Sequence, residues 1–110
     1  MARFIKGEIV VLPFPFSDLS ASKKRPALVL ADLAGDDIIL CQITSQQIKD
    51  PYAILLKESD MINGSLKNES NIRPNRIFTA DKNIILYKIG NVSAGKCQEV
   101  RNKIIEIIDQ

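Results

Sequence analysis

Short hydrophobic runs, each ended by proline, glycine or a polar cluster, recur along most of the chain. Their shortness and their content of valine, isoleucine and leucine are typical of buried β-strands rather than helices. The pattern predicts strands at residues 9–12, 27–31, 38–43 and 52–56, extended segments at 71–73 and 76–79, and a last apolar segment at 83–89.

Prolines and polar clusters set the expected limits of these strands. Arg25 and Pro26 should open the strand at 27–31, since proline is tolerated at a first strand position. Pro74 should halt the segment at 71–73, because proline has no N–H for a strand ladder. Residues 59–63 are expected to form a short helical turn or an ordered loop.

The C-terminal residues show a helical period instead. Ser93 is a good N-cap residue, and the apolar residues after it are spaced by three or four, as on one face of a helix. Because the charges on the opposite face are mixed in sign, we expect the apolar face to pack on the core rather than on a membrane. Its members are Cys97, Val100, Ile104, Ile107 and Ile108.

Six or so short strands followed by one long helix predict a mainly β (α+β) fold, a small, strongly bent antiparallel barrel with a C-terminal helix. A length of 110 residues with 45% hydrophobic residues fits one domain over residues 1–110. The net charge of +2 permits contact with a polyanion without arguing for it. With 5% aromatic residues and no tryptophan, the chain offers few platforms for stacking bases.

Residue types that are missing or isolated exclude several kinds of chemistry. The chain has no histidine, which excludes Ser-His-Asp triads and histidine-rich zinc sites. Cys41 and Cys97 are far apart, which excludes CxxC redox sites, and both are interpreted as small buried residues. We therefore expect no metal and no other cofactor. Neither a signal peptide nor a membrane span is recognisable, so we expect a cytoplasmic protein with no membrane contact.

Arg25 and Thr44 are the first candidates for a site. Arg25 precedes one predicted strand and Thr44 follows the next, so an antiparallel pairing of the two strands would bring them side by side. A guanidinium beside a hydroxyl is a pairing that handles phosphate. On residue type alone, a surface arginine and an edge-strand threonine remain the more ordinary interpretation.

Five segments in order resemble one known family over nearly the whole chain. They read GEIVV at residues 7–11, KRPALVL at 24–30, ITS at 43–45, NIRPNRIFTAD at 71–81 and IGNVS at 89–93. The order and spacing resemble the PemK/MazF-like toxins, which are mRNA interferases of type II toxin–antitoxin systems.

The resemblance implies an SH3-like barrel of the CcdB/MazF/Kid kind, a homodimer, and an antitoxin protein as partner. It further implies metal-independent cleavage of single-stranded RNA to 2′,3′-cyclic phosphate and 5′-OH ends. In the family, the arginine of the R-P motif and the threonine at the next strand end form the catalytic pair, which correspond here to Arg25 and Thr44.

The resemblance also suggests residues that contact RNA. Some members use a basic and an acidic residue in the later segment; Arg73 stands at the basic position, and Asn75 replaces the acid. An amide cannot exchange a proton as a carboxylate does, so no general base can be named. The full set of expected RNA-contacting residues is Arg73, Lys23, Lys24, Ser17, Ser45 and Asn75.

Two alternatives use the same fold. The chain could act by protein binding without RNA cleavage, as the gyrase-poisoning CcdB toxins do, although the R-P and T-S elements fit the nuclease branch better. It could also be a degenerate, non-toxic relative, and Asn75 is the feature that favours this interpretation.

Overall fold

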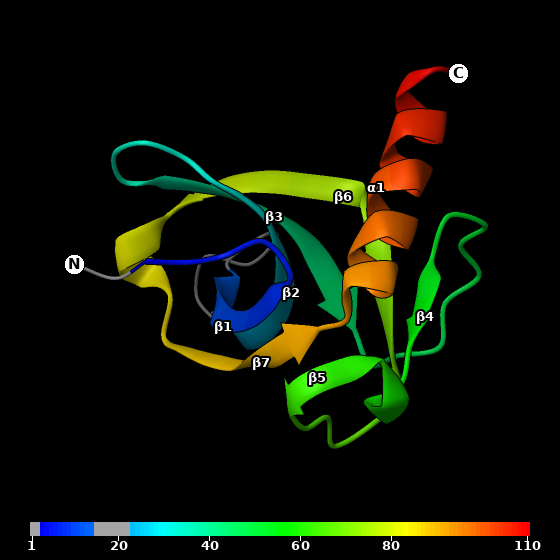
Figure 1. Cartoon of the computed structure of the whole chain (residues 1–110), viewed down its shortest axis with the longest axis horizontal. Helices are drawn as coiled ribbons and strands as arrows, with labels where there is room; N and C mark the ends of the chain where they lie inside the picture. Colours follow the sequence, from blue (N-terminus) through cyan, green and yellow to red (C-terminus); the bar gives the residue numbers. More distant parts are fainter. Residues whose placement is uncertain (1–2, 15–22) are drawn as a thin grey trace.

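One curled antiparallel sheet with a helix against it makes up the computed structural model, which describes residues 3–14 and 23–110 (Figure 1). The seven strands are β1 (Glu8–Phe14), β2 (Lys23–Asp32), β3 (Asp37–Thr44), β4 (Ile54–Leu56), β5 (Met61–Gly64), β6 (Ser70–Asp81) and β7 (Tyr87–Val92). The helix is α1 (Ala94–Ile108), and two short 3₁₀ turns are η1 (Glu58–Asp60) and η2 (Lys82–Ile84).

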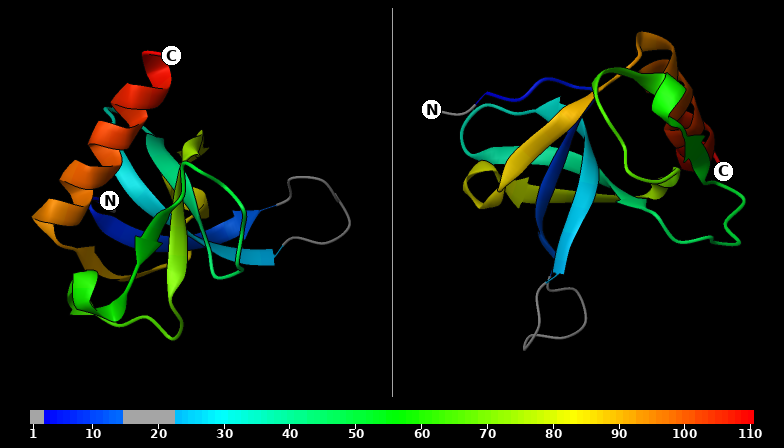
Figure 2. Two further views of the ribbon diagram at one scale, coloured as in Figure 1. Left: turned by 90° about the vertical axis from the view of Figure 1, so that its right-hand side faces the viewer. Right: turned by 90° about the horizontal axis from the view of Figure 1, so that it is seen from below.

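The strands lie in the order β4-β6-β3-β2-β1-β7-β5, and every pairing is antiparallel. Two views in Figure 2 show how the sheet curls and how α1 lies along one side of it. The predicted bent antiparallel barrel with a C-terminal helix is thus confirmed, as a half-barrel of seven strands.

Both faces of the sheet are buried, which explains the continuous apolar runs. Alternate residues of a strand face opposite sides of the sheet, so each central strand feeds two hydrophobic clusters. One cluster includes the fully buried Val100 of α1 and the strand residues Ile9, Leu28, Ile43 and Ile72. The other cluster, on the opposite side, includes Phe4, Leu12, Phe14, Ala27, Val29 and Leu40.

The predicted helix is present and begins after its predicted cap. The Ser93 hydroxyl accepts a hydrogen bond from the Lys96 N–H at 3.2 Å. Of the apolar face, Val100 is fully buried, but Ile108 is 72% exposed because the last turn of α1 extends beyond the sheet (Figure 1). Across residues 3–14 and 23–110, no helix has both the length and the apolar content to cross a bilayer.

Strand β6 differs from the prediction at Pro74. The strand continues from Ser70 to Asp81 along β3, with Arg73 opposite Gln42 and Ile77 opposite Cys41. The residues between these two pairs form a bulge in the ladder. A bulged position needs no ladder hydrogen bond, so a proline there does not end the strand.

Strand β5 differs in the same way from the expected turn or loop at residues 59–63. The helical turn is confined to η1, and the chain then pairs with β7. Gly64 has a φ of +75°, and a Cβ on it would lie 2.1 Å from the carbonyl oxygen of Ile89. The close approach of β5 and β7 therefore depends on glycine at this position.

Candidate active site

The ends of β2, β3 and β6 carry a row of polar side chains. Ala27 of β2 pairs with Gln42 of β3, and continuing this register by two residues places Arg25 opposite Thr44. Thr44 in turn pairs with Asn71 of β6. Residues paired across antiparallel strands face the same side of a sheet, so Arg25, Thr44 and Asn71 lie in one row.

Local structure explains why β2 can carry Arg25 there. The strand begins at Lys23, earlier than predicted, and Pro26 lies within it, paired with Val11 of β1. The hydrogen-bonded register of β2 with β3 begins only at Ala27. On the side facing β3, Pro26 therefore lies before the first ladder hydrogen bond. The N–H that proline lacks is not needed on that side.

Nothing in the described part of the chain takes up the donors of the Arg25 and Thr44 side chains. Arg25 is half-buried, and within residues 3–14 and 23–110 no hydrogen bond or ion pair engages its guanidinium. Thr44 is 8% exposed, and its oxygen accepts the N–H of Gln46 at 3.2 Å, which leaves the hydroxyl hydrogen to donate. A cation and a hydroxyl donor next to each other can bind two oxygens of one phosphate.

Arg73 lies in the neighbouring row, opposite Gln42 on the same face of the sheet. Unlike Arg25, it is engaged: its Nε and Nη2 each donate to Asp50 Oδ2 at 3.2 Å. The Arg73 side chain is 19% exposed and that of Asp50 is 7% exposed. Of the two interpretations that the sequence left open for Arg73, an RNA contact or a salt-bridging residue, the structure shows an ion pair, and this pair is largely buried.

Asp50 is the residue that the sequence analysis missed. Its Oδ1 accepts the N–H of Tyr52 at 2.9 Å, and its Oδ2 accepts from Arg73. Burial alone would raise the pKa of Asp50, but the donors from Tyr52, Arg73 and Asn75 together hold it below the ordinary value. Asp50 is therefore ionised at neutral pH and is a poor proton acceptor.

The other expected RNA-contacting residues lie around this polar end of the sheet. Lys23 and Lys24 are exposed at the start of β2, paired with Phe14 and Pro13 of β1. Ser45 is exposed and, with Pro26 and Tyr87, helps to line a cavity of about 320 Å³. Ser17 lies outside the described residues.

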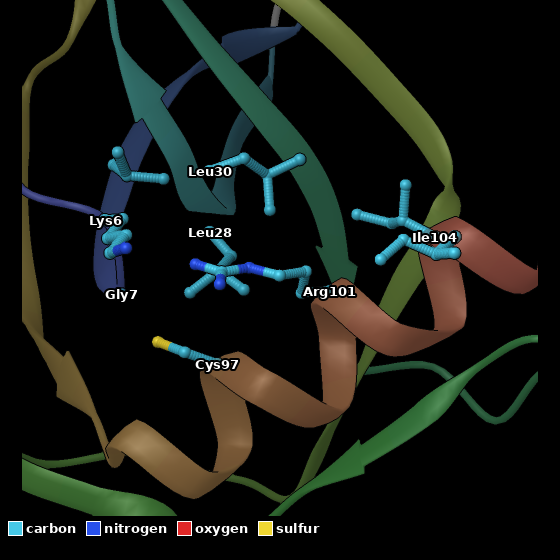
Figure 3. A pocket seen from close by; sticks show the side chains of 9 residues that line it. Lys6, Gly7, Leu28, Leu30, Cys97, Arg101 and Ile104 are labelled. Atoms are coloured by element: carbon cyan, nitrogen blue, oxygen red, sulfur yellow. The ribbon is translucent and has the colours of Figure 1, made fainter.

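A second cavity, of about 140 Å³, lies away from these residues between β2 and α1. Figure 3 shows Leu28 and Leu30 of β2 on one side and Cys97, Arg101 and Ile104 of α1 on the other. None of the expected site residues lines this cavity.

Several solved structures resemble this fold over almost its full length. An endoribonuclease in complex with its cognate antitoxin from a mycobacterial species has a TM-score of 0.74 at 14% identity, covering 97% of this chain and 96% of that chain. The Mycobacterium tuberculosis toxin MazF-mt6 has a TM-score of 0.73 at 16% identity, with 93% and 96% covered. MazE-MazF from Deinococcus radiodurans has a TM-score of 0.72 at 21% identity, with 96% and 95% covered.

The family itself follows from the sequence comparison. A search of the curated proteins gives no match. The model of the PemK-like, MazF-like toxins of type II toxin–antitoxin systems matches residues 5–108, which include every strand, the helix and the polar row. The chain therefore belongs to the family of PemK-like, MazF-like toxins of type II toxin–antitoxin systems.

Proposed function

We propose that this toxin is an endoribonuclease that cleaves single-stranded mRNA, with Arg25 and Thr44 as its catalytic residues. The observation that carries the proposal is the register of β2 with β3, which begins at Ala27 and Gln42 and, continued by two residues, leads to Arg25 and Thr44. Among residues 3–14 and 23–110, nothing takes up the Arg25 guanidinium, and the Thr44 oxygen only accepts. Two similar structures, an endoribonuclease with its cognate antitoxin and an endoribonuclease, both from mycobacterial species, support the same activity.

The proposed chemistry uses a nucleophile that the RNA supplies. The 2′-OH gives its proton to water as its oxygen attacks the adjacent phosphorus, and the bond to the 5′-oxygen breaks. The 5′-oxygen takes a proton from water and leaves as a 5′-OH, while the other end keeps a 2′,3′-cyclic phosphate. Charge builds on the non-bridging oxygens in the transition state. The planar guanidinium of Arg25 binds these oxygens, and the Thr44 hydroxyl adds a donor. Because DNA lacks the 2′-OH, it is not a substrate.

Lys23, Lys24, Ser17, Ser45, Arg73 and Asn75 are proposed to contact the RNA strand around the cleaved bond. The two lysines are exposed and supply charge for the phosphates. We further propose that the toxin acts in the cytoplasm as a homodimer and that its partner is a cognate antitoxin, as in the MazE-MazF structure from Deinococcus radiodurans.

The first test replaces Arg25 with alanine. Loss of the guanidinium should lower the rate of cleavage of a single-stranded RNA by about 10²–10³-fold, because one preorganised donor to the developing charge has that effect. Cleavage is followed on gels, and the 2′,3′-cyclic ends are identified by mass spectrometry. An RNA with a 2′-deoxy nucleotide at the cleaved position should stay intact.

Arg101→Ala is the matched control, because Arg101 is an exposed arginine on α1 at the separate cavity. It should cleave at the wild-type rate. Undiminished cleavage by Arg25→Ala would show that Arg25 is not catalytic. If the wild type instead arrests growth with intact mRNA and gyrase-linked DNA breaks, the CcdB-like alternative is correct; if it has no effect on growth or RNA, the chain is a degenerate relative.

A further inference from the structure

Asp50 joins three parts of the chain beside the candidate active site. It lies in the segment after β3, and its carboxylate accepts hydrogen bonds from Arg73 of β6 and from the N–H of Tyr52, while Asn75 of β6 helps to lower its pKa. The side chain is 7% exposed. A buried carboxylate with several donors fixes the groups that bond to it.

From this arrangement we infer that Asp50 is a positioning residue that holds the guanidinium of Arg73 for the RNA phosphate. The inference rests on the proposed function. Arg73 lies opposite Gln42, and Asn71 lies opposite Thr44, so Arg73 is a diagonal neighbour of Thr44 on the same face. Such diagonal neighbours are about 7–8 Å apart in antiparallel sheets, within reach of an arginine side chain.

The geometry leaves part of Arg73 for a ligand. A guanidinium carries five N–H donors, of which Asp50 receives one from Nε and one from Nη2. Within the described part of the chain nothing else takes up its other donors, so they can bind a phosphate. Because Asp50 already restricts the side chain, less rotamer entropy is lost when Arg73 binds RNA.

Asn75 fits this arrangement better than an acid would. Its side chain helps to lower the pKa of the Asp50 carboxyl, whereas an aspartate at position 75 would place a second negative charge near the first. Asn75 is therefore complementary to Asp50, and its presence is no sign of a degenerate site. The carboxylate at this end of the sheet comes from the segment after β3 instead of from β6.

Asp50 itself does not move the proton in the proposed reaction. One of its oxygens accepts from Tyr52 and the other from Arg73, so neither faces a substrate without a competing donor. Its effect on cleavage must therefore pass through Arg73, and this can be measured.

The test is a double-mutant cycle in cleavage of single-stranded RNA with Asp50→Asn, Arg73→Gln and the double variant. An asparagine at position 50 can still accept the Tyr52 N–H, so the local turn is retained. We expect Asp50→Asn to lower kcat/KM by on the order of tenfold in the wild type and by less than about twofold when residue 73 is glutamine.

Independent, multiplying losses would show that Asp50 supports only the fold, and wild-type kcat/KM in Asp50→Asn would overturn the positioning role outright. Asn75→Asp should also lower kcat/KM, because it places a second carboxylate near that of Asp50. A rise in kcat/KM would contradict the inference. If the wild type cleaves no single-stranded RNA, the proposed function is wrong, and the positioning role falls with it.

Asp32→Asn serves as the matched control. Asp32 forms an ion pair with Lys82 at 2.7 Å, at the far end of β2 from Arg25. This variant should keep the wild-type kcat/KM. Equal losses of kcat/KM in Asp32→Asn and Asp50→Asn would show a general effect of ion-pair removal and would contradict a specific role for Asp50.

Discussion

Two arginines of the same sheet differ in what surrounds them, and the different roles proposed for them rest on this difference. Arg25 has no partner among residues 3–14 and 23–110, whereas Arg73 donates twice to a carboxylate. A free guanidinium can take up developing charge in a transition state, and a paired one is better suited to orient a substrate. Their neighbours in the sequence give no hint of this difference.

For the single residue Asp50, the lowered pKa leads us to expect that the stability of the protein depends on pH. Its pKa in the folded protein is lowered from the ordinary value of 3.8, so its contribution is fully present above that value and is lost as the pH falls through the lower, folded pKa. Asp50→Asn should lower the free energy of unfolding by about 1.5–3 kcal/mol at pH 7, as expected for hydrogen bonds to a charged group.

Urea unfolding of both proteins between neutral and strongly acidic pH measures this difference. The difference in the free energy of unfolding between wild type and Asp50→Asn should become smaller as the pH falls below the ordinary carboxyl pKa. A gap that stays constant with pH would mean that the Asp50 charge does not stabilise the fold.

At the scale of the element, the sequence was a good guide to strands and to the helix, and a poor one to their irregularities. The apolar runs and the Ser93 cap predicted β1, β2, β3, β4 and α1, because burial and capping act locally. The prediction that Pro74 ends the strand was wrong. Pro74 lies in a bulge of β6, where the ladder needs no N–H from it.

The same reasoning explains which parts of the candidate site could be predicted. Arg25 and Thr44 follow from two adjacent strands and one register, which a sequence pattern can indicate. The Asp50–Arg73 pair joins a turn to a strand elsewhere in the chain. Asp50 next to Pro51 has the composition of an ordinary turn, so only the fold reveals its partner.

The cap of α1 gives a prediction for this element. Ser93→Ala removes the acceptor for the Lys96 N–H and should lower the free energy of unfolding by about 1 kcal/mol. Ser93→Asp keeps an acceptor at the cap and is the matched control. Chemical denaturation of the three proteins tests this, and equal stability of Ser93→Ala and wild type would show that the cap does not stabilise α1.

At the scale of the whole molecule, α1 leaves apolar surface uncovered. Ile105 is 50% exposed and Ile108 is 72% exposed, on a helix that also borders the cavity next to β2 (Figure 3). A contiguous exposed apolar patch is typical of a surface that another protein covers, and these two isoleucines are one turn apart on α1. This agrees with the proposed homodimer.

The homodimer predicts a mass in solution of roughly twice 12.3 kDa. Light scattering coupled to gel filtration over a dilution series measures it. Ile105→Glu should shift the mass toward that of the monomer if α1 contributes to the contact. Glu106→Lys is the control, because it changes a residue of the same helix that is already charged. A mass of 12.3 kDa for the wild type at every concentration would refute the dimer.

The pairing of β1 with β7 has a consequence for how the toxin is made. Glu8 of β1 lies opposite Asn91 of β7. Strand β1 therefore cannot pair with β7 until the ribosome has translated most of the sequence. Pairings between such distant segments form slowly, since a long loop must close first. The half-barrel therefore matures late, and a nascent chain carries Arg25 and Thr44 well before β7 completes the sheet around them.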